Sequence, residues 1–341
     1  MKRAKTVFFG SDAIVLPALD FLAGADSPLE LAGVFSQPDR PRGRGQQCQP
    51  NPVSAWALAH GVTLRRPEKI AEEDRRWLAE SGASIALVMA YGHLLKDDLL
   101  SIPPLGFLNL HGSLLPAYRG ASPVVGAIAD GQTQTGVSLM RVVRAMDAGP
   151  VCDREIVPIG AQDDSQVIRE KIAEACVPLL KRALPEVLAG RAVFVEQDKS
   201  RVSYTRKIDK SDGFLDFRRP ADELAARIRA LCPWPACSVE IGGIRIKVFG
   251  AEALDGGRGA IPGTVLRAGK CGLQIAAGAG ILNLTQLQRP GGRRLFAAEF
   301  LRGFPIEEGK GLDGSQMRPL VSGEPFARLS NNLSFDKREN A

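Results

Sequence analysis

Short apolar segments alternate with amphipathic helical patterns through the first 190 residues of the chain, and this alternation most restricts its fold. Apolar runs bounded by Gly, Pro or polar residues predict strands at residues 6–9, 29–35, 85–89, 107–110 and 135–142. Helical spacing predicts helices at residues 15–22, 54–60, 72–81 and 165–188. Strands that alternate with helices predict an α/β fold with a parallel, doubly wound sheet. Ligands bind at the carboxyl ends of such strands, so the segment after residues 107–110 is the first candidate for chemistry.

The pattern changes near residue 206. A helix is predicted at residues 220–231, and five short strands with glycine-rich turns at residues 238–241, 244–249, 263–268, 272–276 and 281–288. Five such strands suggest a small β-barrel of the oligonucleotide/oligosaccharide-binding (OB) kind. We therefore expect a first domain over residues 1–205, with a polar, strand-like connection from about residue 190. A second domain over residues 206–305 and an irregular tail over residues 306–341 follow.

Composition excludes several classes of protein. At 341 residues the chain fits two domains, and none of its apolar runs approaches the ~20 residues that span a bilayer. The N-terminal apolar run is as short as a strand, which is too short for the core of a signal peptide. The six cysteines include no C-x-x-C pair and the chain has three histidines, so we expect no zinc site and a reducing, cytoplasmic location.

The net charge of +6 is unevenly distributed. Residues 1–205 hold 23 basic and 23 acidic side chains, whereas residues 206–341 hold 21 basic and 15 acidic ones. A basic second part indicates a polyanionic partner. Charge alone supports equally well a solvated surface that happens to be basic.

Candidate catalytic side chains follow the strand at residues 107–110. Asn109 and His111 are two residues apart, a spacing that places both on one face of a strand. An amide can stabilise an oxyanion, and an imidazole can do the same or move a proton, which suits acyl transfer. Asp147 is a candidate to orient the imidazole and stabilise its charged form. From spacing alone, a structural His, an Asn in a turn and an Asp in an Asx-turn are equally good interpretations.

The segment Asn109-x-His111-Gly112-Ser113-Leu114-Leu115-Pro116-x-x-Arg119-Gly120, with Asp147 downstream, resembles the signature of the formyltetrahydrofolate-dependent formyltransferases. The resemblance implies a Rossmann-like N-terminal domain and a catalytic trio of Asn109, His111 and Asp147. It also implies that 10-formyltetrahydrofolate is a co-substrate, with no tightly bound cofactor and no metal. The folate contacts that it implies are Ser113, Leu114, Leu115 and Pro116, together with Met89, Ala90, Tyr91 and Gly92 from the loop after residue 88.

A second motif distinguishes between branches of this family. The segment Gln37-Pro38-Asp39-Arg40-Pro41-Arg42-Gly43-Arg44-Gly45 is similar to the Q-P-D-R-P-x-G-R-G loop of methionyl-tRNA formyltransferases. The similarity implies that Arg40, Arg42 and Arg44 contact tRNA, where arginines on a flexible loop can reach phosphates and unpaired bases. An exposed, solvated loop is the alternative. The implied reaction is formyl transfer to the α-amine of the methionine on initiator tRNA, and we expect a monomer without a membrane partner.

Three other functions are weighed against this one. A formyltransferase acting on glycinamide ribonucleotide usually has one domain, so the basic second part counts against it. A formyltransferase acting on a sugar-nucleotide amine can carry a second domain, and the arginine loop distinguishes it. The intact trio argues against an RNA-binding protein without activity. A dehydrogenase is disfavoured because no G-x-G-x-x-G follows the first strand, where Gly10 stands alone.

Overall fold

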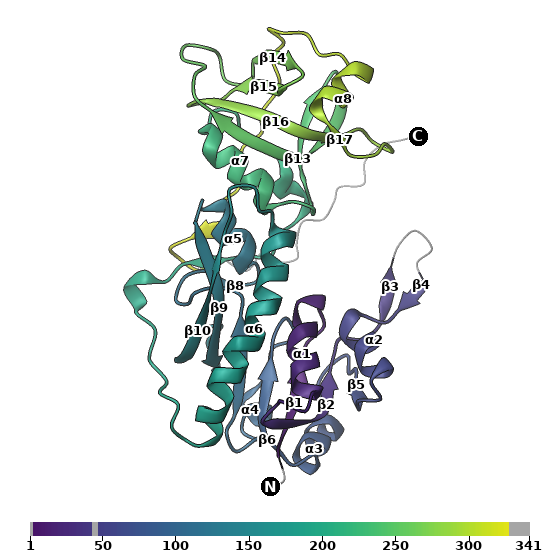
Figure 1. The fold of residues 1–341 in the computed structure, drawn as a ribbon, viewed down its shortest axis with the longest axis vertical. Helices are drawn as coiled ribbons and strands as arrows, with labels where there is room; N and C mark the ends of the chain where they lie inside the picture. Colours follow the sequence, from purple (N-terminus) through teal and green to yellow (C-terminus); the bar gives the residue numbers. More distant parts are fainter. Residues whose placement is uncertain (1–2, 43–46, 327–341) are drawn as a thin grey trace, which may run out of the picture.

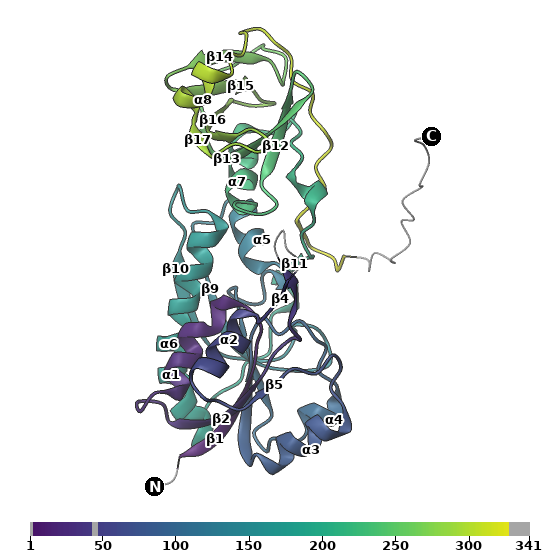
Figure 2. The same ribbon diagram turned by 90° about the vertical axis from the view of Figure 1, so that its right-hand side faces the viewer.

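Two large sheets are stacked along the long axis of the molecule, and helices pack around each of them (Figure 1). The computed structural model describes residues 3–42 and 47–326. Residues 4–158 supply a seven-stranded sheet and residues 237–296 a six-stranded one. Figure 2 shows the same division from the side. None of the helices in these described ranges is long and apolar enough to cross a membrane.

The first sheet has the strand order β10-β9-β7-β6-β1-β2-β5. Its strands are β1 (Ala4–Phe9), β2 (Leu29–Phe35), β5 (Leu64–Arg65), β6 (Ala83–Val88), β7 (Phe107–His111), β9 (Gln134–Arg141) and β10 (Val151–Pro158). The five strands from β7 to β5 pair in parallel, which confirms the predicted parallel sheet. β9 and β10 pair antiparallel, and β10 was not predicted. This edge strand is largely half-exposed, so its sequence lacks a strong apolar run.

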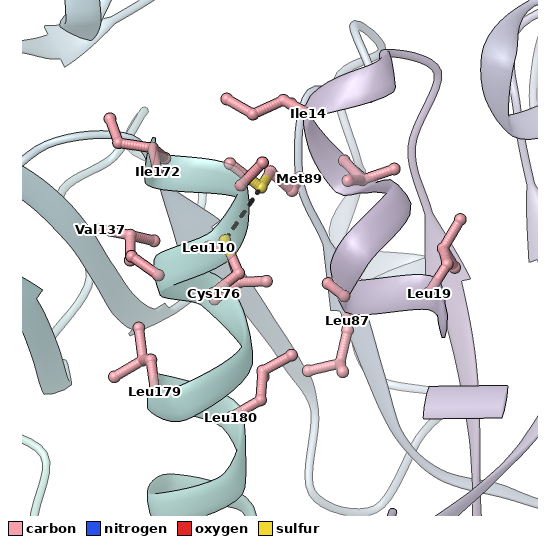
Figure 3. Close-up of a cluster of buried hydrophobic side chains, with 14 of the residues drawn as sticks. Ile14, Leu19, Leu87, Met89, Leu110, Val137, Ile172, Cys176, Leu179 and Leu180 are labelled. Carbon is pink, nitrogen blue, oxygen red and sulfur yellow. Dashed lines mark hydrogen bonds between the residues drawn. The ribbon is translucent and has the colours of Figure 1, made fainter. Parts of the chain in front are cut away.

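Helices cover both faces of this sheet, as a doubly wound fold requires. One face packs against α1 (Leu16–Ala23), α2 (Pro52–Ala59), α5 (Pro123–Ala129) and α6 (Ser165–Leu188), and the other against α3 (Glu72–Glu80) and α4 (Asp97–Leu100). Successive β1 residues alternate between the two cores, since Phe8 lies in the first and Phe9 in the second. Figure 3 shows Leu87 and Leu110 of the sheet near Cys176 and Leu180 of α6.

The second sheet is antiparallel throughout and contains the five predicted strands, with the order β12-β13-β16-β15-β14 and β17 paired to β16. Its strands are β12 (Cys237–Ile241), β13 (Ile244–Leu254), β14 (Val265–Gly269), β15 (Gly272–Ala276), β16 (Ile281–Gln288) and β17 (Leu295–Phe296). Helices α7 (Ala221–Ala230) and α8 (Ala297–Gly303) contribute to its core. Val125 and Ala129 of α5 pack against this second core, so α5 and α7 join the two halves (Figure 1).

A small three-stranded sheet joins segments that are distant in the sequence. β8 (Arg119–Gly120) pairs with β11 (Tyr204–Thr205) of the connection, and β11 pairs with β18 (Val321–Ser322) near the C-terminus. Residues 306–341 were expected to be irregular, yet the part described here contains β18 and the buried side chains Leu312 and Leu320. The remaining elements are a β3–β4 hairpin (Arg40–Arg42 and Gln47–Gln49) and the 3-10 turns Ala13–Val15, Lys199–Arg201 and Lys210–Gly213.

Candidate active site

The end of β7 carries the two side chains that the sequence singled out. Asn109 is half-buried, and His111 is 5% exposed. Asn109 lies between Val88 of β6 and Met140 of β9 in the sheet. The neighbouring strands therefore hold the backbone of both residues in register, which limits how far these side chains can shift.

A cavity of about 530 Å³ opens at this end of the sheet. Four segments form most of its wall: residues 88–95 from the end of β6, residues 109–112, residues 120–125 at the start of α5, and residues 140–147. Ile14 and Arg169 complete the wall. Asn109, His111 and Asp147 all line it. The structure thus brings the three predicted residues together, from two separate segments, at the carboxyl end of the parallel strands, where ligands bind in doubly wound folds.

Asp147 lies beside His111 and is held in place by the motif segment. Its Oδ1 is 3.7 Å from Nδ1 of His111, and its Oδ2 accepts a 2.8 Å hydrogen bond from the backbone N–H of Gly120. The side chain of Asp147 is 15% exposed, so little water screens its interaction with a protonated imidazole. Asp147 can therefore stabilise positive charge on His111.

The other ring nitrogen of His111 determines which atom is available for chemistry. Nε2 lies 3.0 Å from the carbonyl oxygen of Tyr118. A carbonyl only accepts hydrogen bonds, so Nε2 carries the proton and donates it. Nδ1 then has a free lone pair in the neutral ring. His111 can accept a proton at Nδ1, next to Asp147.

The predicted folate residues fall into two groups. Met89, Ala90, Tyr91 and Gly92 line the cavity, while Ser113, Leu114, Leu115 and Pro116 are not among its lining residues. The backbone of the second group is instead held by hydrogen bonds to Ser138 of β9. Ser138 Oγ donates to the Ser113 carbonyl at 2.7 Å and accepts from the Leu115 N–H at 3.0 Å. This segment supports the wall, and its predicted contact with folate stays a prediction.

Tyr91 lines the cavity, but its side chain packs in the core against Phe9, where its hydroxyl is buried. Burial raises the pKa of its phenol, and the nearby Asp74 carboxylate adds to the shift. The group is therefore neutral across the physiological range. Its hydroxyl has no hydrogen-bond partner within the described part of the chain.

Two of the predicted tRNA-contacting arginines, Arg40 and Arg42, lie on β3. Arg40 is exposed and forms a 3.1 Å ion pair with Glu68. Arg42 ends β3, but its side chain lies outside what the structure describes, as does the whole of Arg44. At the base of the hairpin, the Gln37 side chain donates to the Tyr91 carbonyl at 2.9 Å. Gln37 links the hairpin to the cavity wall, a role that the sequence analysis did not assign to it.

The described residues contain no cluster of three or more His, Cys, Asp or Glu side chains that could hold a metal ion. A "Formyl transferase" model matches residues 4–184, and a "Formyl transferase, C-terminal domain" model matches residues 207–305. This chain belongs to the formyl transferase family. Asn109, His111 and Asp147 all lie in the part that the first family model matches.

Two relatives align with most of this chain. The methionyl-tRNA formyltransferase of Halorhodospira halophila is 35% identical over 322 residues, which cover 94% of this chain and 99% of the relative. That of Pseudomonas syringae pv. tomato is 39% identical over 292 residues, or 85% and 92% of the two chains. This formyl transferase therefore aligns with such relatives across both of its sheets.

Two solved structures share the fold at low sequence identity. An N-formyltransferase from Helicobacter canadensis, in complex with folinic acid and dTDP-3-aminofucose, superposes with a TM-score of 0.62 at 16% identity. The match covers 83% of this chain and 99% of that one. HypX from Aquifex aeolicus, in complex with tetrahydrofolic acid, has a TM-score of 0.56 at 15% identity over 92% of this chain and 51% of its own. These similarities show the fold alone.

Proposed function

We propose that this formyl transferase moves the formyl group of 10-formyltetrahydrofolate to the α-amine of methionyl-tRNA. The observation that carries the proposal is the meeting of Asn109, His111 and Asp147 in one cavity. Full-length relatives named methionyl-tRNA formyltransferase, at 35% and 39% identity, support the choice of acceptor. The folate acts as a co-substrate, and none of the steps proposed here requires a metal.

The reaction needs a stabilised oxyanion and a place for one proton. The neutral amine of the acceptor attacks the formyl carbon and forms a tetrahedral intermediate, whose oxyanion Asn109 stabilises, joined by His111 once its Nδ1 is protonated. The C–N bond to the folate then breaks, which leaves the formyl group on the amine. Nδ1 of His111 is placed to take the proton that the amine loses, and Asp147 stabilises the resulting imidazolium. The proton finally passes to the folate nitrogen that leaves.

The cavity wall suits a flat, partly apolar ligand. Met89, Tyr91 and Val142 supply apolar surface, while the backbone of the segment after β6 supplies donors and acceptors. We assign the folate to this wall. Catalysis and folate binding then fall to residues 1–205, and tRNA binding to residues 206–305 together with the arginine hairpin. We also infer that the protein acts as a monomer in the cytoplasm.

A sugar-nucleotide amine is the alternative acceptor, because a solved N-formyltransferase of the same fold is in complex with dTDP-3-aminofucose. Incubation with labelled formylfolate and separate acceptors distinguishes the alternatives. We expect label in methionyl-tRNA and none in a sugar-nucleotide amine or glycinamide ribonucleotide. Label in either of the last two would replace the proposed acceptor.

The trio is tested by substitution. Asn109→Ala and His111→Ala should each lower turnover by about 10²–10³, the typical cost of losing one oxyanion-stabilising donor. Asp147→Ala should have at least as large an effect, while folate affinity changes only a few-fold. Steady-state kinetics and folate titration measure these values. Near-wild-type turnover in any of the three variants would rule out the assigned role of that residue.

The hairpin is tested by Arg44→Ala. If this arginine contacts tRNA, the variant should show a higher KM for methionyl-tRNA or a lower kcat with it, and an unchanged KM for folate. Arg66→Ala serves as a control, since Arg66 is ion-paired with Asp39 near the hairpin. Equal changes in the KM for both substrates would show that Arg44 does not act on tRNA.

A further inference from the structure

Gln197 forms four hydrogen bonds between the catalytic segments. Its Oε1 accepts from Nε and Nη2 of Arg119, at 3.0 and 2.8 Å. Its Nε2 donates to the backbone carbonyls of Asp147 and Gly149, at 2.9 and 2.7 Å. The side-chain amide thus joins the arginine of the sequence motif to the backbone of the proposed catalytic aspartate.

Arg119 determines which way this amide points. A guanidinium only donates hydrogen bonds, so the atom of Gln197 that faces it must be the oxygen. The amide nitrogen is then directed at the two carbonyls, and the reverse orientation would place donor against donor and acceptor against acceptor. Arg119 is 9% exposed and Gln197 is 8% exposed, so water cannot replace these bonds easily.

Asp147 needs such support because of its backbone conformation. Its φ is +51°, in the left-handed region that residues other than glycine rarely adopt. Its carboxylate is held from one side by the Gly120 N–H, and its carbonyl from the other by Gln197. With both ends held, the carboxylate stays beside Nδ1 of His111.

Gln197 comes from a part of the chain that neither family model matches. It lies between residues 184 and 207, in the connection that follows α6. Within the described residues, Arg119 forms no ion pair. Its side-chain hydrogen bonds go to the neutral amide of Gln197.

We propose that Gln197 is a positioning residue for formyl transfer, which holds Asp147 beside His111 and is itself oriented by Arg119. The proposal rests on the proposed function, because it gives Asp147 a catalytic role. Gln197 lines none of the cavity and touches no reacting atom. Its effect on catalysis passes through Asp147.

Two substitutions separate this role from a merely structural one. Gln197→Glu keeps an oxygen acceptor for Arg119 but loses both donations to the Asp147 and Gly149 carbonyls. Gln197→Met has a similar length and loses all four bonds. If Gln197 only satisfies the buried Arg119, the Glu variant should match the wild type, since a carboxylate is a stronger partner for a guanidinium. If Gln197 positions Asp147, both variants should be impaired.

We expect both variants to lower kcat by about 10- to 100-fold, because small displacements of catalytic groups have effects of this size. The KM values for folate and for methionyl-tRNA should change less than about threefold, since the cavity wall is intact. Folate titration and thermal melts of the full-length protein verify folding. A Gln197→Glu variant with wild-type kcat would overturn the proposal.

A double-mutant cycle with Asp147→Asn provides the second readout. If Gln197 acts through Asp147, adding Gln197→Glu to Asp147→Asn should lower kcat by less than about twofold further. A full additional loss in that background would show that Gln197 acts independently of Asp147, which overturns the positioning role. Wild-type kcat in the single variant Asp147→Asn would instead refute the proposed function of the trio. This outcome is measured on the single variant, so it is distinguished from a failure of the positioning role.

Discussion

Gly120 shows how one residue connects the motif to the rest of the site. Its φ is +113°, and a Cβ at this position would lie 2.1 Å from the backbone oxygen of Thr205. Its N–H is the group that holds the carboxylate of Asp147. Only glycine fits where β8 runs this close to β11, so the close approach of these strands and the placement of Asp147 depend on the same residue.

Gly120→Ala should therefore disturb both the fold and the chemistry. The backbone must move to relieve the contact with Thr205, and the N–H moves with it, so we expect turnover to fall by about 10²-fold. Gly131→Ala is the matched control. Its φ is +66° but nothing lies within 4 Å of the added Cβ, so it should cost only about 1 kcal/mol of stability and leave turnover unchanged. Equal turnover in the two variants would contradict this explanation.

At the scale of elements, Arg318 holds the C-terminal segment just before β18 against Asp209 and Asp212. Its Nη2 donates to Asp209 Oδ2 at 2.5 Å and to Asp212 Oδ1 at 2.8 Å. The hydrogen bond from Arg318 lowers the pKa of Asp209 to about 2. Burial alone would raise the pKa of Asp212, but hydrogen bonds from Arg206, Arg318 and the Asp209 amide hold it below its ordinary value.

These lowered pKa values predict how stability depends on pH. A carboxylate with a depressed pKa stabilises the fold fully above its unfolded pKa of ~3.9, and the contribution is lost as pH falls toward the folded value. The difference in Tm between the wild type and Arg318→Met should therefore shrink between about pH 5 and pH 2.5. Thermal melts across this range measure it, with Arg302→Met as an exposed control. A difference that stays constant with pH would show that Arg318 contributes through packing alone.

At the scale of the whole molecule, the net positive charge belongs to a different part of the chain from the proposed catalytic residues. The catalytic candidates and the cavity belong to the formally neutral residues 1–205, while the entire excess of +6 belongs to residues 206–341. Lysines and arginines that neutralise tRNA phosphates release counterions, so binding should weaken steeply as salt rises. If the second sheet binds the tRNA backbone, its exposed basic side chains should carry this dependence.

Charge reversal tests this division of labour. Arg245→Glu with Lys247→Glu changes two exposed side chains on β13 and should weaken binding of cognate and non-cognate tRNA about equally, because phosphate contacts carry little sequence information. The slope of affinity against salt should also flatten. Lys69→Glu with Arg76→Glu makes the same charge change on exposed residues of the first part and should alter neither value. Binding isotherms across a salt series measure both values. Equal tRNA affinities and salt slopes for the two double variants would contradict the assignment of tRNA binding to the second sheet.

Periodicity predicted the regular elements well where one face is buried. The predicted helix at residues 165–188 and the strands at residues 29–35, 272–276 and 281–288 have the bounds that the structure shows. β10 and α5 were missed. β10 is a half-exposed edge strand, and α5 is a short apolar helix buried between the two cores, so neither has the pattern of a single buried face.

Local sequence determined which strands and helices form and which residue types are available for chemistry, because burial of one face imposes a period on the amino acids. It placed Asn109 and His111 on one strand end for the same reason. Only the tertiary structure decided that Asp147 lies 3.7 Å from His111, and that Gln197 supports it from 50 residues further along the chain. Such contacts depend on how separate segments cross in space, and hydrogen bonds between side chain and backbone across a fold leave no periodic trace in the sequence.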